Sequence, residues 1–442
     1  MTEMFKYIYK KIRTNMTINS NPQSLIDELH QLWSHHNFNE LASDAVKHLT
    51  SGSATDWGIP ADVESPITPI TLGGGIPDAG TLPKEELLDA MRRALDAPDD
   101  EPLRYGGGIG YEPLRHELAK RYTRDRHISA TSDHFLLTNG SADAIDLICG
   151  TFLSPGDIVI SEAPTFSGTL RTFRGHQAEI LSVGIDREGM IIDELEQLLS
   201  KLETEGRRAK IIYVISNCHN PAGISMSHAR RESLLRTAAK FGCLIVDDDA
   251  YGELYYTPEP PVTLSELSQG QGVITVGTFS KIIATGLRVG WVFADPSIIE
   301  QIVRVRFDMG NSPMLHHMLW QFMQDGRLDK HIVNMRSLYS EKLESLASAL
   351  HEYCEPYMSF QKPSGGFFLW AQLHENLDAL EVQREGIKQG VIFANGHGFF
   401  PDHHDLSQHL RFAFSWVPHE DIQEGAQRLA KACAIVSDNN RK

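Results

Sequence analysis

The feature that most constrains the fold is a repeated alternation of short apolar runs with helix-like stretches over residues 135–295. The apolar runs, each bounded by turn residues, are FLLTNG, DIVISEAP, EILSVGI, KIIYVIS, CLIVDDDAY, VITVGT and VGWVFAD. Helical stretches such as SADAIDLICGTFL, IDELEQLLSKLE and ARRESLLRTAAKFG lie between several of them. Strands that alternate with helices form a mostly parallel sheet with both faces covered. The pattern therefore predicts an α/β fold with a mostly parallel, seven-stranded sheet.

The chain before this region divides into a helical stretch and an arm. Residues 24–49 carry apolar side chains at helical spacing, so we expect an amphipathic packing helix; these residues include Leu25, Ile26, Leu29, Leu32 and Trp33. Residues 50–83 are rich in Gly, Pro, Ser and Thr and contain LGGGIPD, which is typical of an extended arm. We assign residues 1–80 to this helix and arm.

The chain after Ile299 changes character. Helical patterns dominate from QIVRVRF to SLYSEKLESLASAL, with a turn at GNSP. The strand-like segments GGFFLWAQL and LRFAFSW then precede a last helix, EDIQEGAQRLAKACAIV. This order is typical of a smaller α+β domain. We therefore expect a large domain over residues 81–308 and a small C-terminal domain over residues 309–442.

The composition argues against several kinds of partner. A formal net charge of -17 disfavours nucleic acid, because binding to phosphate backbones needs a basic surface. No apolar run approaches the roughly 20 residues that span a bilayer, and the basic N-terminal stretch MTEMFKYIYKKIRTNM lacks the apolar core of a signal peptide. The five cysteines show no CxxC pair, which favours a reducing compartment. We expect a cytoplasmic protein without a membrane anchor, with Met16 as an alternative start to Met1.

In an open α/β sheet, ligands bind beyond the carboxyl ends of the strands, so the residues after each apolar run are the candidate site. After HFLLT come Asn139, Gly140, Ser141 and Ala142, a turn of small residues that opens the helix ADAIDLI. The free N–H groups at this helix start would favour an anion such as phosphate. The alternative is a helix that Ser141 simply caps.

Two further strand ends carry polar residues. After IIYVIS comes NCHNPAG, in which Asn220 and Pro221 predict a tight turn. After CLIV come Asp247, Asp248 and Asp249. Three adjacent aspartates are typical of a solvated strand edge or of a magnesium site, and the run itself does not distinguish the two.

The strand VITV is followed by a lysine and an arginine. Thr278, Ser280 and Lys281 come directly after the strand, and Arg288 lies seven positions beyond Lys281. The planar guanidinium of arginine suits phosphate, whereas a lysine amine can lose its proton and attack a carbonyl carbon. Pyridoxal 5'-phosphate (PLP) is the cofactor that requires both groups. No GxxxxGK[ST] motif is present, so the glycine triplets at 73–75 and 106–108 do not indicate a nucleotide-binding loop.

From about Gly73 to the C-terminus, the chain resembles the class I/II aminotransferases of the fold-type I PLP-dependent superfamily, particularly the kynurenine and 2-aminoadipate aminotransferase branch. The stretch TFSKIIATGLRVGW is the most specific element, since it resembles the family's Ser-Lys followed by Gly-Leu-Arg-x-Gly. The resemblance implies an aminotransferase that converts an L-amino acid to its 2-oxo acid by ping-pong transamination via pyridoxamine phosphate. It also implies a homodimer with shared active sites.

The resemblance also assigns roles to residues of this chain. Lys281, Asp248 and Tyr251 would be catalytic, with Lys281 bound to the cofactor aldehyde and Asp248 in contact with the pyridine nitrogen. The residues that would bind the cofactor are Tyr105, Ser141, Ala142, Phe166, Asn220, Asp248, Tyr251, Thr278, Ser280, Lys281 and Arg288. Among these, Phe166 would stack on the ring, and Tyr105 would reach the phosphate of the neighbouring subunit. The residues that would bind the substrate are Arg411, Asn220 and Gly75.

The chain departs from the family pattern at several positions near the expected site. The residues that differ are Ala142 and Asp143, Phe166, His219, Asn395 and Gly396. None of these differences removes a core cofactor contact. Because the protein decides which bond of the substrate is broken, a PLP-dependent lyase, cyclase or oxidase is the alternative to a transaminase. A non-enzymatic regulator with the same fold is a further alternative, and the intact Lys281 argues against it.

The stretch HGFFPDHH, with His397, His403 and His404, suggests a metal site by composition. It falls in a loop for which the family has no metal ligand. We therefore expect no metal.

Overall fold

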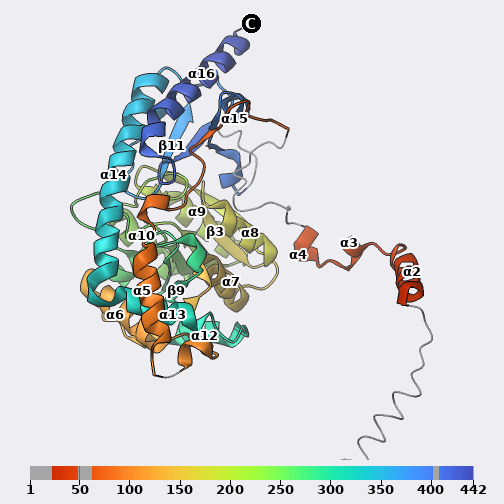
Figure 1. Ribbon diagram of the computed structural model, residues 1–442, viewed down its shortest axis with the longest axis vertical. Helices are drawn as coiled ribbons and strands as arrows, with labels where there is room; N and C mark the ends of the chain where they lie inside the picture. Colours follow the sequence, from red (N-terminus) through yellow and green to blue (C-terminus); the bar gives the residue numbers. More distant parts are fainter. Residues whose placement is uncertain (1–21, 48, 50–61, 99, 402–407, 442) are drawn as a thin grey trace, which may run out of the picture. The chain divides into compact units, whose positions relative to one another are not determined.

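The computed structural model describes residues 22–47, 49, 62–98, 100–401 and 408–441, and Figure 1 shows its elements. The chain forms two compact units, Met1–Thr50 and Ser51–Lys442. The basic stretch at residues 1–16 lies outside the described residues. The expected domain boundaries after residues 80 and 308 fall inside the second unit, and they stay predictions.

The described part of the first unit contains three short helices in place of the one helix expected over residues 24–49. They are α2 (Pro22–Trp33), α3 (Phe38–Leu41) and α4 (Asp44–Lys47). The first break falls at SHHN, where the Asn37 side chain accepts a hydrogen bond from the Asn39 N–H at 3.0 Å. Such a local bond starts a new helix and competes with continuation of the preceding one. The expectation of one continuous helix is therefore wrong, and its packing role stays a prediction.

The large sheet has eight strands within the described residues. In spatial order they are β2 (Phe135–Thr138), β9 (Gly290–Phe293), β8 (Val273–Thr278), β7 (Leu244–Asp248), β6 (Ala209–Val214), β3 (Ile158–Ala163), β4 (Glu179–Asp186) and β5 (Gly189–Met190). The four central pairings from β8 to β4 are parallel, whereas β9 and β5 run antiparallel to their neighbours. The α/β fold with mostly parallel strands is confirmed.

The strand count corrects the expected sheet of seven. Seven of the strands are those that the apolar runs predict, and the eighth is the two-residue β5. It lies in the turn segment REGM, which is too short and too polar to form an apolar run. Its two residues pair with Ile185 and Asp186 at the end of β4, so β5 extends the sheet edge by one tight hairpin.

Helices cover both faces of the large sheet, and alternating strand residues form two separate cores. In chain order the helices of this region are α5 (Lys84–Leu95), α6 (Glu112–Asp125), α7 (Gly140–Phe152), α8 (Ser167–Gly175), α9 (Ile192–Thr204), α10 (His228–Phe241), α11 (Leu264–Ser268) and α12 (Pro296–Val305). Val159 and Ile211 pack in one core with residues of α7 and α12. Their neighbours Ile160 and Ile212 pack in the other core with residues of α9 and α10. The period of two along each strand thus buries both faces, as the sequence predicts.

The C-terminal region builds a second, antiparallel sheet in the order β10-β11-β14-β13. Its strands are β10 (Met358–Phe360), β11 (Phe368–Leu373), β13 (Ala394–Asn395) and β14 (His409–Ala413). The helices are α13 (Pro313–Met323), α14 (Arg327–Cys354), α15 (Ala379–Lys388) and α16 (Ile422–Asn440). In Figure 1 the long α14 runs beside both the region of β9 and the region of β11. Within the described residues, this region therefore contains the helices and the strands that the sequence predicts after Ile299.

The arm is tied to the C-terminal region by a short strand that the sequence did not predict. Within the arm, β1 (Ile70–Thr71) pairs in parallel with β12 (Val391–Ile392). The arm then meets β14, where the Leu72 carbonyl accepts a hydrogen bond from the Ala413 N–H at 2.6 Å and the Gly73 carbonyl accepts one from Arg411 Nη2 at 3.0 Å. The arm near residue 70 therefore lies beside strands near residues 391 and 413.

Short 3-10 turns complete the described elements: Ala79–Thr81, Glu101–Leu103, Ser132–His134, Thr285–Leu287, Gln324–Gly326, His397–Phe399 and His419–Asp421. All five cysteines are buried, and none forms a disulfide. Among the helices of the described residues, none combines the length and the apolar character that a membrane crossing requires.

Candidate active site

The candidate site lies at the carboxyl ends of the central strands. Asp248 is the last residue of β7, Lys281 follows β8, and Asn220 follows β6. The arm reaches this edge, because the Gly75 carbonyl accepts a hydrogen bond from Lys281 Nζ at 2.7 Å. Arg411 of β14 reaches it from the small sheet, with its Nη1 3.0 Å from Asn220 Oδ1. The structure therefore brings together residues that are widely separated in the sequence.

Lys281 is held as a buried amine. Burial and the positive charge of Arg411 lower the pKa of Lys281 to about 8, although Asp248 acts in the opposite direction. Its Nζ lies 5.7 Å from the centroid of the Tyr251 ring. An amine that loses its proton near neutral pH can attack a carbonyl carbon and then carry protons. These properties fit a cofactor-binding lysine.

The carboxyl of Asp248 is buried and only partly satisfied. Its Oδ2 accepts a hydrogen bond from the Tyr213 hydroxyl at 2.8 Å, while Oδ1 has no partner in the part of the chain that the structure describes. Burial raises the pKa of Asp248 to about 6, against the opposing effect of the Tyr213 hydrogen bond. A protonated ring nitrogen at Oδ1 would satisfy this atom and favour the ionised carboxylate. No sequence signal marks Tyr213, which stands in β6 as an ordinary core aromatic.

The interpretation of the aspartate run as a solvated edge is wrong, because Asp247, Asp248 and Asp249 are only 0%, 6% and 8% exposed. Asp249 accepts hydrogen bonds from Arg126 Nη2 at 3.0 Å and from Asn217 Nδ2 at 2.7 Å. Burial, reinforced by the charge of Asp249, raises the pKa of Asp247 to about 7. The strand end is therefore part of a buried polar network.

The magnesium interpretation of the aspartate run finds no geometric support. Within residues 22–47, 49, 62–98, 100–401 and 408–441, no group of three or more His, Cys, Asp or Glu is arranged to hold a metal ion. Of the histidines that suggest a metal by composition, His403 and His404 lie outside these ranges, whereas His397 begins a 3-10 turn.

The start of α7 is open to an anion. The helix begins at Gly140, and its N-cap residue Asn139 makes no side-chain capping bond. The alternative in which Ser141 caps the helix is therefore wrong, since Ser141 lies inside the first turn. The N–H groups of Ser141 and Ala142 belong to the set that a helix start leaves without intrahelical partners. They are available to a phosphate, which the helix dipole also favours.

Arg288 links the loop after β8 to the start of α7. Its Nη1 lies 3.3 Å from Ser280 Oγ, and its Nη2 donates to the Asn139 carbonyl at 3.1 Å. Thr278 Oγ1 accepts a hydrogen bond from the Ser280 N–H at 3.1 Å. Gly140 has φ +79, and a Cβ there would lie 2.6 Å from Arg288 Nη2. Glycine is needed at this position because a side chain would displace the guanidinium.

Arg411 is the candidate carboxylate-binding group. It is 3% exposed, and its Nη2 donates to the Gly73 carbonyl at 3.0 Å, in addition to the bond with Asn220. The guanidinium carbon lies 4.4 Å from the ring centroid of Phe368 and 4.8 Å from that of Phe399. Burial lowers the pKa of Arg411 to about 10, and its Nε has no hydrogen-bond partner among the described residues. A buried cation with a free donor is suited to a carboxylate ligand.

Three further residues that the resemblance assigns to the site lie in three different surroundings. Gly75 is in the site, because its carbonyl binds Lys281 and a Cβ on Gly75 would clash with the Phe368 ring. Phe166 precedes α8 and packs against the core on the α7 side of the sheet. Tyr105 is 83% exposed on the surface of its own subunit. The sequence does not predict the two rings beside Arg411, those of Phe368 and Phe399. An isolated phenylalanine in a strand or a loop has the pattern of a core residue.

The donor set fits PLP. The orphaned Oδ1 of Asp248 suits a ring nitrogen, Lys281 suits an aldehyde, and the α7 start with Arg288 suits a phosphate. A parallel sheet that carries these three groups at its carboxyl edge defines a PLP-dependent enzyme of fold type I.

Comparisons with known proteins specify this enzyme further. The family described as aminotransferase class I and II matches residues 68–429. The chain is 36% identical to aromatic-amino-acid aminotransferase 1 of Thermococcus litoralis over 82% of this chain and 87% of the relative. It is 31% identical to the 2-aminoadipate transaminase of Thermus thermophilus over 82% of this chain and 89% of the relative. The solved kynurenine aminotransferase of Pyrococcus horikoshii superposes with a TM-score of 0.84 at 31% identity, covering 90% of this chain and 98% of that one. The chain belongs to the class I and II aminotransferases.

Family membership confirms the PLP cofactor and the transaminase activity that the sequence predicts. The substrates are accordingly amino acids and 2-oxo acids. The assigned role of each site residue stays a prediction.

Proposed function

We propose that this aminotransferase acts on L-amino acids with aromatic or apolar side chains. The observation that carries the proposal is the surrounding of Arg411, whose guanidinium carbon lies 4.4 Å from the ring centroid of Phe368 and 4.8 Å from that of Phe399. A carboxylate bound there would place the rest of the substrate beside aromatic surface, which attracts apolar groups and aromatic rings. Two relatives named for aromatic substrates, an aromatic-amino-acid aminotransferase and a kynurenine aminotransferase, support the same class.

In the proposed mechanism, Arg411 and Lys281 act at two ends of the reacting centre. When bound, PLP supplies an electron sink for the charge left at Cα after its proton is removed. Lys281, with a pKa of about 8, accepts this proton and returns it. Arg411 fixes the carboxylate, with Asn220 as its hydrogen-bond partner, so that Cα is held near Lys281.

The remaining residues would hold the cofactor. Asp248 would keep the ring nitrogen protonated, because its buried Oδ1, unpartnered among the described residues, is stabilised as a carboxylate by a positive charge beside it. Asn220 and Tyr251 would hold the ring oxygen, and Phe166 would stack on the ring. The phosphate is bound by Ser141, Ala142, Thr278, Ser280 and Arg288.

A single-turnover experiment tests the reaction and the substrate class together. The holoenzyme is mixed with one amino acid at a time and no 2-oxo acid, and the products are identified by mass spectrometry. We expect stoichiometric pyridoxamine phosphate with the matching 2-oxo acid, formed fastest from phenylalanine, tyrosine and kynurenine. Multiple turnovers with release of ammonia, peroxide or a cyclised product would instead identify a lyase, oxidase or cyclase. Faster reaction with aspartate or 2-aminoadipate would contradict the aromatic preference.

We also propose a homodimer with shared active sites. Two loops carry exposed apolar side chains, with Tyr105 83%, Phe307 94% and Met309 51% exposed. The loops lie against each other, because a Cβ on Gly310 would meet the Gly107 carbonyl. Apolar surface of this kind on neighbouring loops is typical of a protein interface.

Mixing two inactive variants tests the shared site. Lys281→Ala lacks the reactive amine, and Tyr105→Ala lacks the side chain proposed to reach the partner's phosphate. A hybrid dimer contains one site with both residues intact, so refolding the variants together should restore part of the activity. No recovery in a mixture that sedimentation shows to be dimeric would contradict a shared site.

We propose a cytoplasmic location. The five cysteines are buried without a disulfide, which suits a reducing compartment. Cell fractionation that places the activity with membranes or outside the cell would contradict this location.

A further inference from the structure

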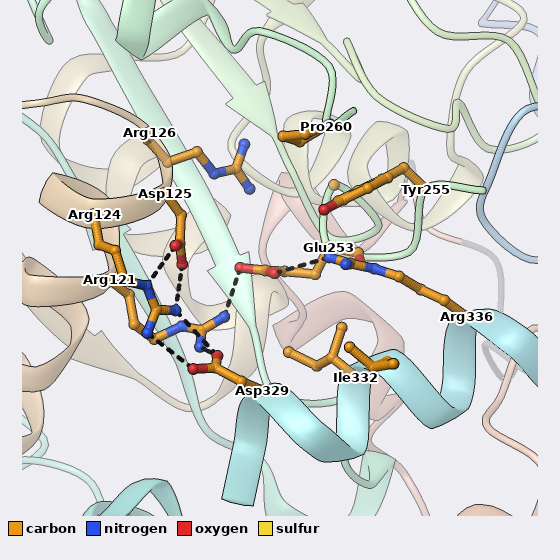
Figure 2. Close-up of a pocket in the computed structure, with 12 residues that line it drawn as sticks. Arg121, Arg124, Asp125, Arg126, Glu253, Tyr255, Pro260, Asp329, Ile332 and Arg336 are labelled. Carbon is orange, nitrogen blue, oxygen red and sulfur yellow. Dashed lines mark hydrogen bonds and ion pairs between the residues drawn. The ribbon is translucent and has the colours of Figure 1, made fainter. Parts of the chain in front are cut away.

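A second pocket opens behind the loop that follows Tyr251. Its volume is about 370 Å³, which lies in the range of about 300–1,000 Å³ that small-molecule sites occupy. Figure 2 shows arginines from the end of α6 on one side, and Tyr255, Pro260 and Ile332 on the other. None of the residues assigned to the cofactor or the substrate lines this pocket.

Most charged side chains of the pocket are paired with one another. Arg121 pairs with Glu253 at 3.2 Å and also with Asp329. Arg124, on the outer side, pairs with Asp329 at 2.9 Å and with Asp125. Figure 2 draws these contacts as a connected chain. The paired groups neutralise each other and leave little attraction for a ligand.

Arg126 is the exception. It is 9% exposed, and its only side-chain hydrogen bond in the described part of the chain runs from Nη2 to Asp249, which is not among the residues that line the pocket. Figure 2 draws no contact between Arg126 and another residue that lines the pocket. The Nε and Nη1 donors of a buried guanidinium are therefore free for a ligand, and a carboxylate is the group that matches two such N–H groups.

The opposite side of the pocket is apolar. Tyr255, Pro260, Ile332 and Val333 line it, and the guanidinium of Arg336 lies 3.7 Å from the Tyr255 ring centroid. Arg336 is already engaged, because its Nε donates to the Glu253 carbonyl at 2.6 Å. A ligand that fits this pocket has a single carboxylate at one end and an apolar or aromatic body at the other.

We propose that this pocket binds a small organic carboxylate, with its carboxylate on Arg126 and its apolar body against Tyr255 and Ile332, and that binding slows transamination. The inhibitory effect, unlike the binding, rests on the proposed function of the neighbouring site. The class of ligand includes aromatic carboxylic acids, whose shape and charge match the two sides of the pocket.

The link to the cofactor site runs through Asp249. Its carboxylate is the present partner of Arg126, and it directly follows Asp248 in the chain. A ligand carboxylate at Nε and Nη1 shares the positive charge of Arg126 with Asp249, so the charge of Asp249 is less neutralised. The negative charge of Asp249 disfavours ionised Asp248. Since Asp248 holds the charge on the ring nitrogen, a less ionised Asp248 slows the removal of the Cα proton.

Binding is tested with 4-bromobenzoate, which has no amino or oxo group and is not a transamination substrate. Isothermal titration of the holoenzyme should show two sites, one at Arg411 and one in the pocket. The variant Arg126→Gln should weaken the pocket site by about tenfold or more and leave the Arg411 site unchanged. The matched control Arg236→Gln removes an exposed arginine of α10 and should change neither. This measurement requires no catalysis, so it stands apart from a failure of the proposed reaction.

Kinetics and crystallography complete the test. At the Arg411 site 4-bromobenzoate competes with the amino acid, whereas in the pocket it lowers kcat at saturating amino acid. The kcat effect should disappear in Arg126→Gln and persist in Arg236→Gln. Crystals of the wild-type holoenzyme soaked in 4-bromobenzoate should show anomalous bromine scattering beside Tyr255, a readout that needs no variant. Bromine only beside Arg411, purely competitive inhibition, or an undiminished kcat effect in Arg126→Gln would overturn the proposal.

Discussion

Lys281 shows how burial of a single residue is linked to stability. Burial and Arg411 lower the pKa of Lys281 in the folded chain to about 8, against 10.5 for a free lysine. Below pH 8 the amine is protonated in both states, and the folded state holds this charge at a cost. At about 1.4 kcal/mol per unit of pKa, the lowering of the Lys281 pKa corresponds to about 3 kcal/mol of lost folding stability. The cost disappears as the pH rises from about 8 to 10.5, because the folded state then loses the proton first.

A neutral side chain at this position should stabilise the apoprotein. Lys281→Met is expected to raise the free energy of unfolding at pH 7 by up to about 3 kcal/mol, and the gain should shrink between pH 8 and 10.5. Denaturant unfolding of both apoproteins over this pH range measures the effect. Lys240→Met, at an exposed position of α10, is the control and should show no such pH dependence. A gain that is the same at every pH would mean that packing, not charge, is responsible.

Arg411 should determine how well the substrate carboxylate is held. Arg411→Gln is expected to reduce kcat/KM by about 10- to 100-fold, because a hydrogen bond to a charged group contributes roughly 1.5–3 kcal/mol. PLP should stay bound, since Arg411 is assigned to the substrate and acts on the cofactor site only through its charge near Lys281 and its bond to Asn220. Steady-state kinetics and the visible spectrum check the two parts. Loss of the cofactor spectrum would show that Arg411 supports the cofactor site as well, and Arg236→Gln should leave both readouts unchanged.

At the scale of elements, the start of α7 offers a matched pair of glycines. Gly140 has φ +79 and lies against Arg288, whereas Gly150 lies in the same helix, where the atom nearest to an added Cβ is His176 Cε1 at 3.8 Å. Gly140→Ala should displace Arg288 and weaken PLP binding, in addition to straining the backbone. Gly150→Ala should preserve PLP binding and stabilise the protein by about 0.5–1 kcal/mol, because alanine favours a helix interior.

Two measurements on both variants distinguish these effects. Fluorescence titration of the apoproteins gives the dissociation constant of PLP, and thermal unfolding of the apoproteins gives the stability. Equal loss of PLP affinity in both variants would show that the helix as a whole, and not the contact with Arg288, determines phosphate binding.

The elements also show where periodicity succeeds and where it fails. The seven apolar runs predict seven strands correctly, because a strand buried on both faces is recognisable from its own residues. The helix expected over residues 24–49 fails, because a local hydrogen bond of Asn37 interrupts it. The run Asp247–Asp249 suggests an exposed strand edge, but the structure buries it. Arg126, a partner far away in the sequence, binds Asp249 there.

At the scale of the whole molecule, the chain separates into residues 1–50 and residues 51–442. The class I and II aminotransferase match begins at residue 68, within the second unit. We expect a protein of residues 51–442 to fold, bind PLP and transaminate with the kcat/KM of the full chain. Thermal unfolding and single-turnover kinetics of the two proteins check this. A loss of more than about tenfold in kcat/KM would mean that residues 1–50 contribute to the site.

Within the second unit, we propose a large domain over residues 81–308 and a small domain over residues 309–442, with the arm as a link between them. The arm pairs with β12 in a separate two-stranded sheet, and its Leu72 carbonyl accepts a hydrogen bond from the Ala413 N–H of β14 in the small sheet. Its Gly75 carbonyl accepts the hydrogen bond from Lys281 beside the large sheet. A segment in contact with both sheets is suited to transmit motion between two domains.

The sequence by itself determined the α/β class, and it predicted the strand ends that carry the chemistry and the pairing of Lys281 with Arg288 around one cofactor. These features depend on periodicity and short spacings, which a chain expresses locally. Only the tertiary structure decided which distant groups complete the site. The Tyr213 hydroxyl on Asp248, the Gly75 carbonyl on Lys281 and the rings around Arg411 come from segments up to 206 positions apart. Such contacts follow from how the two sheets and the arm pack together, and no local pattern encodes them.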